Sequence, residues 1–322
     1  MSTAQLSTQY CIGIDLGGTK LQLIATSRES MSSGSFHSAV PSGPEYFAQR
    51  TPTGPTFIPA TFAISLRAFL ATLPPAASIF SVGVAICGLV DPTSGDITLC
   101  EVSGLVGWNI AKAVREELHA LEKDKTYRIK AEESVKIEVV NDAAAALEYV
   151  RRFEAMEDMS GERAKDVAVF VVGTGIATAL LVNDTPVRGH LSFAGNLGIA
   201  PVLTSPPGSG STKMLDELAG GRALAKRILD ETVLTPSEAI ELLAEKTVEE
   251  IQGDKMSRRL YVAIVDAATS LGIAVANVVC LMNPRLVVLA GVGIVWIPSS
   301  NDHFVKCNAQ NRTTELPFFI LT

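Results

Sequence analysis

The residues best suited to chemistry stand in a glycine turn near the start of the chain. Asp15 ends a run of β-prone apolar residues, and Gly17 and Gly18 then permit backbone angles that other residues resist. Thr19 adds a hydroxyl and Lys20 an ammonium group before a second apolar run. The pattern predicts a strand, a tight turn and a second strand. Backbone N–H groups of such a turn can bind a phosphate, and Asp15 could hold Mg²⁺ through water.

This turn differs from the two common nucleotide loops. The Walker loop has a longer glycine spacing and leads into a helix, and the dinucleotide fingerprint also opens a helix. Here a strand pattern follows the glycines instead. Taken alone, the segment could equally be an ordinary hairpin turn, and Lys20 could be a solvated turn residue.

In two later segments, polar or glycine residues again come directly after a predicted strand. A predicted strand at 135–140 ends at Asn141-Asp142 and leads into a helix, so Asp142 could be the helix N-cap or a carboxylate facing a cleft. A strand at 166–172 then leads to Gly173-Thr174-Gly175 and a partner strand. Two strand–glycine turn–strand patterns in the two halves indicate a duplicated architecture with a cleft between the halves.

The elements around these segments alternate between strand and helix. Helical spacing is predicted at 62–73, 108–122, 143–154, 215–229 and 256–282, with strands at 79–86 and 286–290. This alternation predicts an α/β fold with layered sheets. We expect an N-terminal domain at 1–140, a C-terminal domain at 141–297 and an atypical tail at 298–322 without a helical pattern.

Composition narrows the function classes. The 322 residues are 47% apolar and 19% charged, enough for a substantial core, and the net charge of −7 argues against nucleic acid as the main partner. Five scattered cysteines favour free thiols in a reducing compartment over a disulfide framework. We see no signal peptide, and the apolar runs look too short to span a bilayer, so the expected location is cytoplasmic.

Taken together, the segments resemble the ROK family of sugar kinases and repressors, within the actin-like ATPase and sugar-kinase superfamily. They stand in family order over residues 10–295, and several motifs in register are far more specific than any one alone. The matching segments are Ile12–Lys20, Gly88–Gly95, Gly107–Asn109, Asn141–Ala146, Gly173–Ile176, Arg188-Gly189 with Ala194-Gly195, and Asn283-Pro284 with Leu289–Gly291.

The resemblance implies two ribonuclease H-like domains around a nucleotide and sugar cleft, and an ATP-dependent kinase of a hexose or N-acylhexosamine. Asp142 would be the general base and Asn141 would bind a sugar hydroxyl. The other implied phosphate or ATP contacts are Asp15 (through Mg²⁺ and water), Gly17, Gly18, Thr19, Lys20, Gly173, Thr174, Gly175 and Gly291. The implied partners are a sugar and ATP, with no nucleic acid and no membrane; dimers are common in the family, so a homodimer is an expected state.

The sugar side departs from the family pattern. Asn196 and Ile199 stand where family kinases carry a Glu and a His that contact the sugar, and Gly104 replaces an Asn. Asp216 takes the place of a second Glu with a shorter side chain. The segment 201–214, where the family places its zinc cysteines, has none, so we expect no zinc.

These departures keep a second function open, a catalytically weak regulator that binds sugar and ATP. Direct DNA binding is disfavoured because only about ten residues precede the first strand, too few for the helix-turn-helix of the family's repressors. An actin-like ATPase acting through partners is a third and more distant alternative. The segments Gly107-Trp108 and Asn141–Ala144 argue against it.

Overall fold

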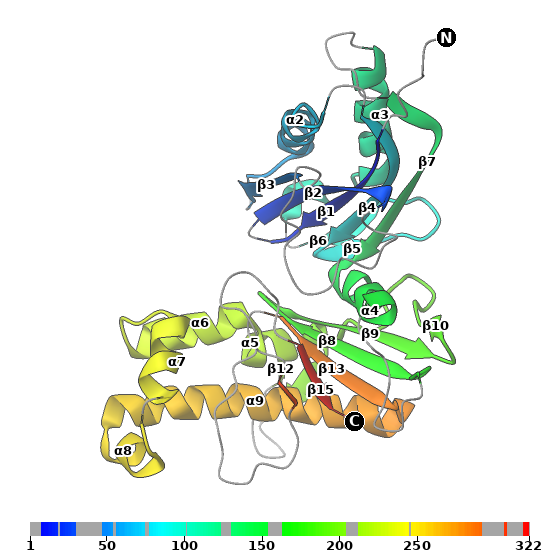
Figure 1. Ribbon diagram of the computed structural model, residues 1–322. Helices are drawn as coiled ribbons and strands as arrows, with labels where there is room; N and C mark the ends of the chain where they lie inside the picture. Colours follow the sequence, from blue (N-terminus) through cyan, green and yellow to red (C-terminus); the bar gives the residue numbers. More distant parts are fainter. Residues whose placement is uncertain are drawn as a thin grey trace. The chain divides into compact units, whose positions relative to one another are not determined.

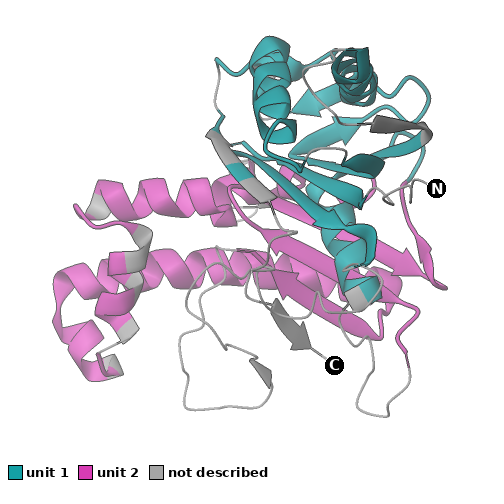
Figure 2. Ribbon diagram, turned by 45° about the horizontal axis from the view of Figure 1, so that its top comes forward, with its two compact units in different colours: residues 1–154, 189–193 teal, residues 155–188, 194–322 magenta. Residues whose placement is uncertain are grey.

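The computed structural model divides into two compact units, coloured separately in Figure 2. Unit 1 comprises residues 1–154 and 189–193, and unit 2 comprises residues 155–188 and 194–322. The structure describes residues 8–18, 20–29, 47–53, 56–74, 77–100, 102–123, 130–153, 163–203, 212–244, 246–291, 306–307 and 318–321.

Unit 1 is built on a five-stranded sheet in the order β3-β2-β1-β4-β7 (Figure 1). β2 is antiparallel to both of its neighbours, β1 and β3, whereas β4 and β7 run parallel to β1. Alternate residues of β1 and β2 are buried, which is the pattern of strands with one face on a core. The strands are β1 (Gln9–Leu16), β2 (Lys20–Ser27), β3 (Phe47–Pro52), β4 (Ser78–Ile86) and β7 (Lys130–Asn141).

Helices cover this sheet and a small hairpin extends from it. The helices are α2 (Pro59–Leu70), α3 (Ile110–Lys123) and α4 (Asp142–Phe153); the hairpin is β5 (Gly88–Val90) with β6 (Ile97–Cys100), followed by the short turn η1 (Ser103–Leu105). Helix α2 contacts α3, and α4 contacts β4 and β7. Trp108, two residues before α3, packs edge-to-face on Phe62 of α2 with ring centroids 5.1 Å apart.

Unit 2 repeats the plan with a sheet in the order β10-β9-β8-β13-β15-β14. The hairpin of β8 and β9 is antiparallel, and β13 runs parallel to β8. The strands are β8 (Val167–Val172), β9 (Ile176–Val182), β10 (Thr185–Pro186), β13 (Leu286–Ala290), β14 (Lys306–Cys307) and β15 (Phe318–Leu321). Part of the expected tail therefore joins the sheet, because β15 pairs antiparallel with β13.

The remaining elements of unit 2 are helices and a small two-stranded sheet. They are η2 (Leu197–Ile199), β11 (Pro201–Leu203), β12 (Thr212–Met214), α5 (Leu215–Ala219), α6 (Gly221–Glu231), α7 (Pro236–Ala244), α8 (Val248–Gly253) and α9 (Lys255–Met282). The prediction of a single helix at 215–229 is wrong. The segment forms two helices, because Gly220 is the C-cap of α5 and the N-cap of α6. Helix α7 begins with a capping box: the Thr235 N–H donates to Glu238 Oε2 at 2.7 Å, and the Glu238 N–H donates to the Thr235 hydroxyl at 3.3 Å.

Helix α9 runs along the sheet of unit 2, with α7 and α8 near its N-terminal end (Figure 1). Ala274 and Val278 of this helix join core clusters that include residues of β8 and β13. By length and composition alone, α9 could cross a bilayer, so the expectation that the apolar runs are too short for a membrane span is wrong. The helix also contacts α5, α6 and α8 of its own unit, as a core helix does.

Unit 1 continues through α4 to residue 154, whereas the sequence predicted a domain boundary between residues 140 and 141. The reason is that α4 packs back on β4 and β7, so the helix belongs to the sheet that it follows. Residues 189–193 also group with unit 1, although the chain on both sides of them belongs to unit 2.

The N-terminus of α9 yields a test of local stability. Asp254 is the N-cap: its Oδ2 accepts hydrogen bonds from the Ser257 N–H at 2.9 Å and the Ser257 hydroxyl at 2.6 Å. These bonds hold the pKa of Asp254 at about 2, below its ordinary value of 3.8. We expect Asp254→Ala to lower the urea midpoint of unit 2 at neutral pH, because four N–H groups at a helix start need partners.

The sign of the pH effect follows from the lowered pKa. The stabilisation by Asp254 is complete above about pH 4 and disappears as the pH falls toward 2, where the carboxylate becomes protonated in the folded protein as well. The difference in urea midpoint between wild type and Asp254→Ala should therefore shrink over that interval. Asp230→Ala, at an exposed position of α6, is the control. An equal difference at pH 7 and pH 2 would contradict the assignment.

Candidate functional site

The predicted site residues of unit 1 lie where three parallel strands of its sheet end, at the edge formed by their carboxyl ends. Leu16 of β1 is in register with Ile86 of β4, and Ile86 is in register with Asn141 of β7. The three strands are parallel, so their carboxyl ends leave the sheet side by side. With strands about 4.8 Å apart, the glycine turn after Leu16 and the helix start at Asp142 are separated by about 10 Å across the edge.

The first glycine turn is a tight hairpin, as predicted. Gly17 N–H donates to Lys20 O at 2.8 Å and closes the turn, while the Thr53 hydroxyl donates to Gly17 O at 2.8 Å. Gly17 therefore contributes its N–H to the turn itself, and Gly18 is the next donor along it. Thr19 lies outside the described residues.

Asp15 stands on β1 between two buried residues and is itself exposed on the opposite face. Although the side chain is accessible to solvent, neighbouring protein atoms displace part of the water around its carboxylate and raise its pKa, and the positive charge of Lys20 opposes this rise. Within the described residues no three acidic, His or Cys side chains gather as a metal cage. A Mg²⁺ ion at Asp15 would thus complete its shell with water and phosphate oxygens, which is how this ion is usually held.

The start of α4 separates the two roles that the sequence left open for Asp142. Asn141 is the N-cap: its Oδ1 accepts from the Ala144 N–H at 2.7 Å. The alternative that Asp142 is the cap is therefore wrong, since Asp142 is the first residue of the helix and its Oδ1 accepts from the adjacent Ala143 N–H at 2.8 Å. Capping uses the Asn141 oxygen and leaves its amide nitrogen as the group that could donate to a hydroxyl.

Gly104 stands in η1, where the resemblance expects an Asn. A Cβ at this position would lie 2.8 Å from Phe57 O, closer than real Cβ atoms approach backbone. Any side chain here would require the backbone to shift. Gly104 can therefore contribute only backbone atoms to a sugar site.

The predicted residues of unit 2 also meet at a sheet edge. Gly173–Gly175 joins β8 to β9 in a turn closed by Gly173 N–H donating to Gly175 O at 2.9 Å. Gly291 follows β13, the parallel neighbour of β8, with φ of +125°, and a Cβ there would overlap Val172 O. The two segments therefore touch through backbone, which only glycine at 291 permits.

Asp216 connects this turn to the segment of Asn196. Its Oδ1 accepts from the Ile176 N–H at 2.6 Å, and its carboxylate lies so near Gly198 that a Cβ there would overlap it. Gly195 lies equally close to β9 and accepts from the Thr178 N–H at 2.8 Å. Asn196 is thereby held beside β9, where its amide nitrogen is buried and has no hydrogen-bond partner among the residues that the structure describes.

Sequence reasoning missed a helix start that supports the second turn. The N–H groups of Gly221 and Arg222, at the beginning of α6, donate to Gly173 O and Thr174 O, each at 3.0 Å. A Cβ at Gly221 would overlap Gly173 O. The signal was the Gly220-Gly221 pair inside a stretch otherwise typical of a helix.

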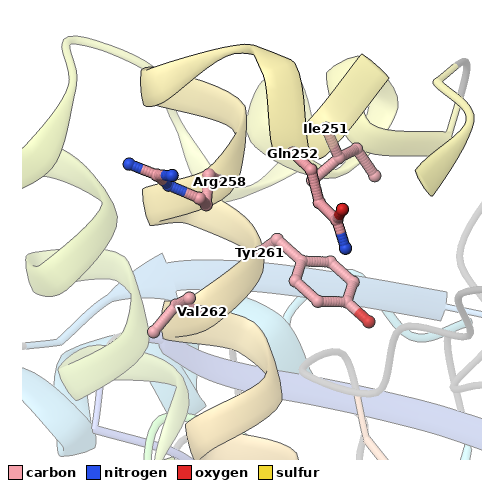
Figure 3. A pocket seen from close by; sticks show the side chains of 5 residues that line it. All are labelled: Ile251, Gln252, Arg258, Tyr261 and Val262. Carbon is pink, nitrogen blue, oxygen red and sulfur yellow. The ribbon is translucent and has the colours of Figure 1, made fainter. Parts of the chain in front are cut away.

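Two surface pockets within single units lie apart from these residues. One of about 480 Å³ is lined by Ile251, Gln252, Arg258, Tyr261 and Val262. Figure 3 shows Gln252 and Tyr261 on one side of the α8–α9 junction, with Arg258 extending away from them. The other, of about 240 Å³ in unit 1, is lined by Leu89, Asp91, Thr98, Leu99, Leu191 and Phe193. Neither is lined by a predicted site residue.

The comparisons with known proteins agree with this arrangement. The fold is α/β, with two mixed sheets that each carry helices of their own unit. Residues 11–299 match the ROK family model, and the chain belongs to the ROK family. The expected family and fold are thus confirmed.

Its relatives differ in activity. A 192-residue stretch, 59% of the chain, is 29% identical to the bifunctional enzyme NanE/NanK of Brucella suis and spans 33% of that enzyme. A ROK family glucokinase of Streptomyces griseus, solved with glucose and AMPPNP, is similar with a TM-score of 0.61 and 20% identity over 88% of this chain and 83% of its own. A ROK family transcriptional regulator, a homolog of the E. coli MLC protein, has a TM-score of 0.56 and 15% identity over 86% of this chain and 64% of its own.

The backbone contact at Gly291 gives a second test. We expect Gly291→Ala to lower the free energy of unfolding of unit 2 by about 2 kcal/mol or more, because its φ is unfavourable for alanine and its Cβ would overlap Val172 O. Urea unfolding followed by circular dichroism measures this change. Gly272→Ala in α9, where a Cβ meets nothing within 4 Å, is the control and should add about 0.5–1 kcal/mol. Equal effects of the two variants would contradict the close contact.

Proposed function

We propose that this protein is an ATP-dependent carbohydrate kinase that transfers the γ-phosphate to a hydroxyl of a hexose or N-acylhexosamine. One observation carries the proposal: the in-register ends of β1, β4 and β7 bring the first glycine turn and Asn141-Asp142 to one sheet edge. The separation of about 10 Å leaves room for a phosphoryl group and an acceptor hydroxyl between them. Membership of the ROK family supports the reaction class.

In unit 1, the proposed chemistry needs positioning and one proton acceptor. Asp142 accepts the proton of the sugar hydroxyl as the hydroxyl oxygen attacks the γ-phosphorus. Asn141, fixed by its cap to α4, donates its amide N–H to a neighbouring sugar hydroxyl. Asp15 would hold Mg²⁺ through water, and the ion would neutralise phosphate charge when bound. Gly17, Gly18, Thr19 and Lys20 would contact the phosphates.

In unit 2, we assign nucleotide contacts to the backbone turn at Gly173, Thr174 and Gly175 and to Gly291. The close packing at Gly291 and Gly221 supports this, because it keeps side chains away from the turn and fixes its shape. Asn196 and Asp216 are assigned to the sugar. The buried amide nitrogen of Asn196 supports its assignment, since a sugar oxygen would give that donor an acceptor, and the described part of the chain provides none.

A second function has specific support, a regulator of the same fold that binds sugar and ATP with little catalysis. Asn196 and Ile199 replace the two sugar-contacting residues of family kinases, and Gly104 cannot carry a side chain in place. A sugar hydroxyl that loses its hydrogen-bonding partner in a pocket without water weakens the binding free energy by about 1–3 kcal/mol. The similarity to a ROK family transcriptional regulator shows that the fold serves regulators as well.

The remaining assignments follow from the proposed kinase. ATP and the sugar are its small-molecule partners, acting in the cytoplasm, with a homodimer as the expected assembly and neither nucleic acid nor a membrane as a partner. The substrate hydroxyl stays unassigned among hexoses and N-acylhexosamines. The chain spans about a third of the length of the bifunctional relatives that it matches, so their activities are not carried over.

Kinase activity is tested by ADP release with a panel of hexoses and N-acetylhexosamines. We expect turnover with at least one sugar and a fall in kcat of about 10²–10⁴-fold in Asp142→Ala, because the transferred proton loses its acceptor. Asp142→Asn should be as impaired, since an amide keeps the shape without the basicity. Asp230→Asn, at an exposed position of α6, is the matched control and should retain full activity.

Nucleotide binding separates the two functions. ATP should raise the melting temperature of wild type and Asp142→Ala alike, because Asp142 is assigned to the sugar hydroxyl and not to the nucleotide. Binding of ATP and sugar without turnover in wild type would reject the kinase and favour the regulator. Wild-type turnover that persists in Asp142→Ala would reject Asp142 as the base.

Zinc content is a separate test of the sequence interpretation. We expect less than stoichiometric zinc after purification without chelators, because the segment 201–214 offers no cysteine to a four-ligand site. Elemental analysis by mass spectrometry measures the ratio of metal to protein. One zinc per chain would overturn the interpretation.

A further inference from the structure

Two cysteine side chains face each other at the base of the β5–β6 hairpin in unit 1. The Sγ atoms of Cys87 and Cys100 are 4.0 Å apart. Cys87 directly precedes β5 and Cys100 is the last residue of β6, where it pairs with Gly88. The sulfurs are thus neighbours across two strands, although thirteen positions separate them along the chain.

The hairpin backbone holds this geometry. A Cβ at Gly88 would overlap Leu99 O and lie 3.0 Å from Cys100 Cα, so the two strands approach more closely than an ordinary side chain permits. Asp91 fixes the far end of the same hairpin, because its Oδ1 accepts from the N–H groups of Thr93 and Ser94, each at 2.8 Å. Neither strand can slide along the other without breaking these contacts.

The two thiols differ in exposure. Cys100 is 9% exposed and belongs to the core of unit 1, whereas Cys87 is only partly buried at the edge of that core. A dissolved oxidant therefore reaches Cys87 first, and Cys100 is the thiol positioned to react next. Cys11 and Cys280 are free thiols elsewhere, Cys11 in β1 and Cys280 at an exposed position of α9.

We propose that Cys87 and Cys100 form a modification site, a thiol pair that a hydroperoxide converts to a reversible intramolecular disulfide. The Cys87 thiol loses its proton, and the thiolate attacks one oxygen of hydrogen peroxide. The O–O bond breaks, Cys87 becomes a sulfenic acid, and the departing hydroxide takes up the released proton and leaves as water. The Cys100 thiol then attacks the Cys87 sulfur and displaces the hydroxyl group, which takes the Cys100 proton and leaves as a second water. Two thiols are oxidised and one hydrogen peroxide is reduced to two waters.

Closure of the disulfide has a consequence for the first glycine turn. The S–S bond is about 2.05 Å long, so the sulfurs must approach by about 2 Å. Cys87 N–H donates to Leu16 O at 3.0 Å, and Leu16 is followed by Gly17 and Gly18. Displacement of Cys87 therefore acts on the residue that anchors the turn. This second step rests on the proposed kinase function; the modification itself does not.

Peptide mapping tests the modification without an activity assay. Trypsin releases both cysteines in one peptide, residues 68–112, because no Lys or Arg lies between them. After hydrogen peroxide and blocking of remaining thiols, this peptide should have lost two hydrogen atoms and carry no blocking group. Cleavage beside Asp91 and Asp96 should then leave two fragments joined until dithiothreitol is added.

Variants make this result decisive. Cys87→Ala and Cys100→Ala should each abolish the link, and Cys280→Ser should leave it unchanged. If Cys100→Ala does not fold because it alters the core, Cys87→Ala still tests the proposal, since Cys87 is only partly buried. A peptide that stays fully blocked after peroxide, or Cys87 linked to a different cysteine, would overturn the proposal.

The coupling to the glycine turn is measured on the full chain. Oxidised wild type should show about tenfold lower kcat/KM for ATP than the reduced protein, since displacements of about 1 Å in a phosphate site cost that much or more. Dithiothreitol should restore it, and Cys100→Ala should not respond to peroxide. An unchanged kcat/KM in disulfide-linked protein would overturn the coupling. Absence of turnover in reduced wild type would instead reject the kinase, with the mapped disulfide unaffected.

Discussion

The hydrogen-bond register of three parallel strands is the constraint on which unit 1 depends. Because Leu16, Ile86 and Asn141 are paired across β1, β4 and β7, the segments after these strands leave the sheet at one edge. A shift by one residue would turn every buried side chain of a strand to the opposite face. Burial of Ile12, Ile14 and Leu16 on one side of β1 therefore fixes the register, and the register in turn places Asp15 on the opposite, exposed face.

Unit 2 reaches a comparable arrangement through backbone contact. Gly291, Gly195 and Gly221 each lie where a Cβ would overlap a carbonyl oxygen of a neighbouring segment. Gly291 brings the end of β13 against the end of β8, and Gly221 brings the start of α6 against the turn at 173–175. Gly195 brings the Asn196 segment against β9. The site is consequently built from main-chain atoms with few side-chain degrees of freedom. Such a surface suits an anionic group that is recognised by N–H donors.

The sequence predicted those parts of the fold that depend on local pattern. Runs of β-prone apolar residues and the glycine turns after them identified both strand–turn–strand segments. The pairing of β15 with β13 could not be predicted, because a distant strand decides it. The Gly220-Gly221 pair was a sequence signal for the break between α5 and α6, but the hydrogen bonds that fix the break come from distant residues. Gly220 ends a helix that is otherwise continuous in pattern, since the following N–H groups donate to Gly173 and Thr174.

The candidate site shows the same limit. Residue types and their order were enough to select Asp15, Asn141, Asp142 and Asp216 as candidate site residues. They did not show which structural or chemical role each residue has. Whether Asn141 or Asp142 capped α4 depended on where the helix began, and a difference of one residue decided it. Because the cap falls to Asn141, the carboxylate at Asp142 is not required as the N-cap of α4. With that division of roles, the general base that we propose at Asp142 would be compatible with a stable helix directly behind it.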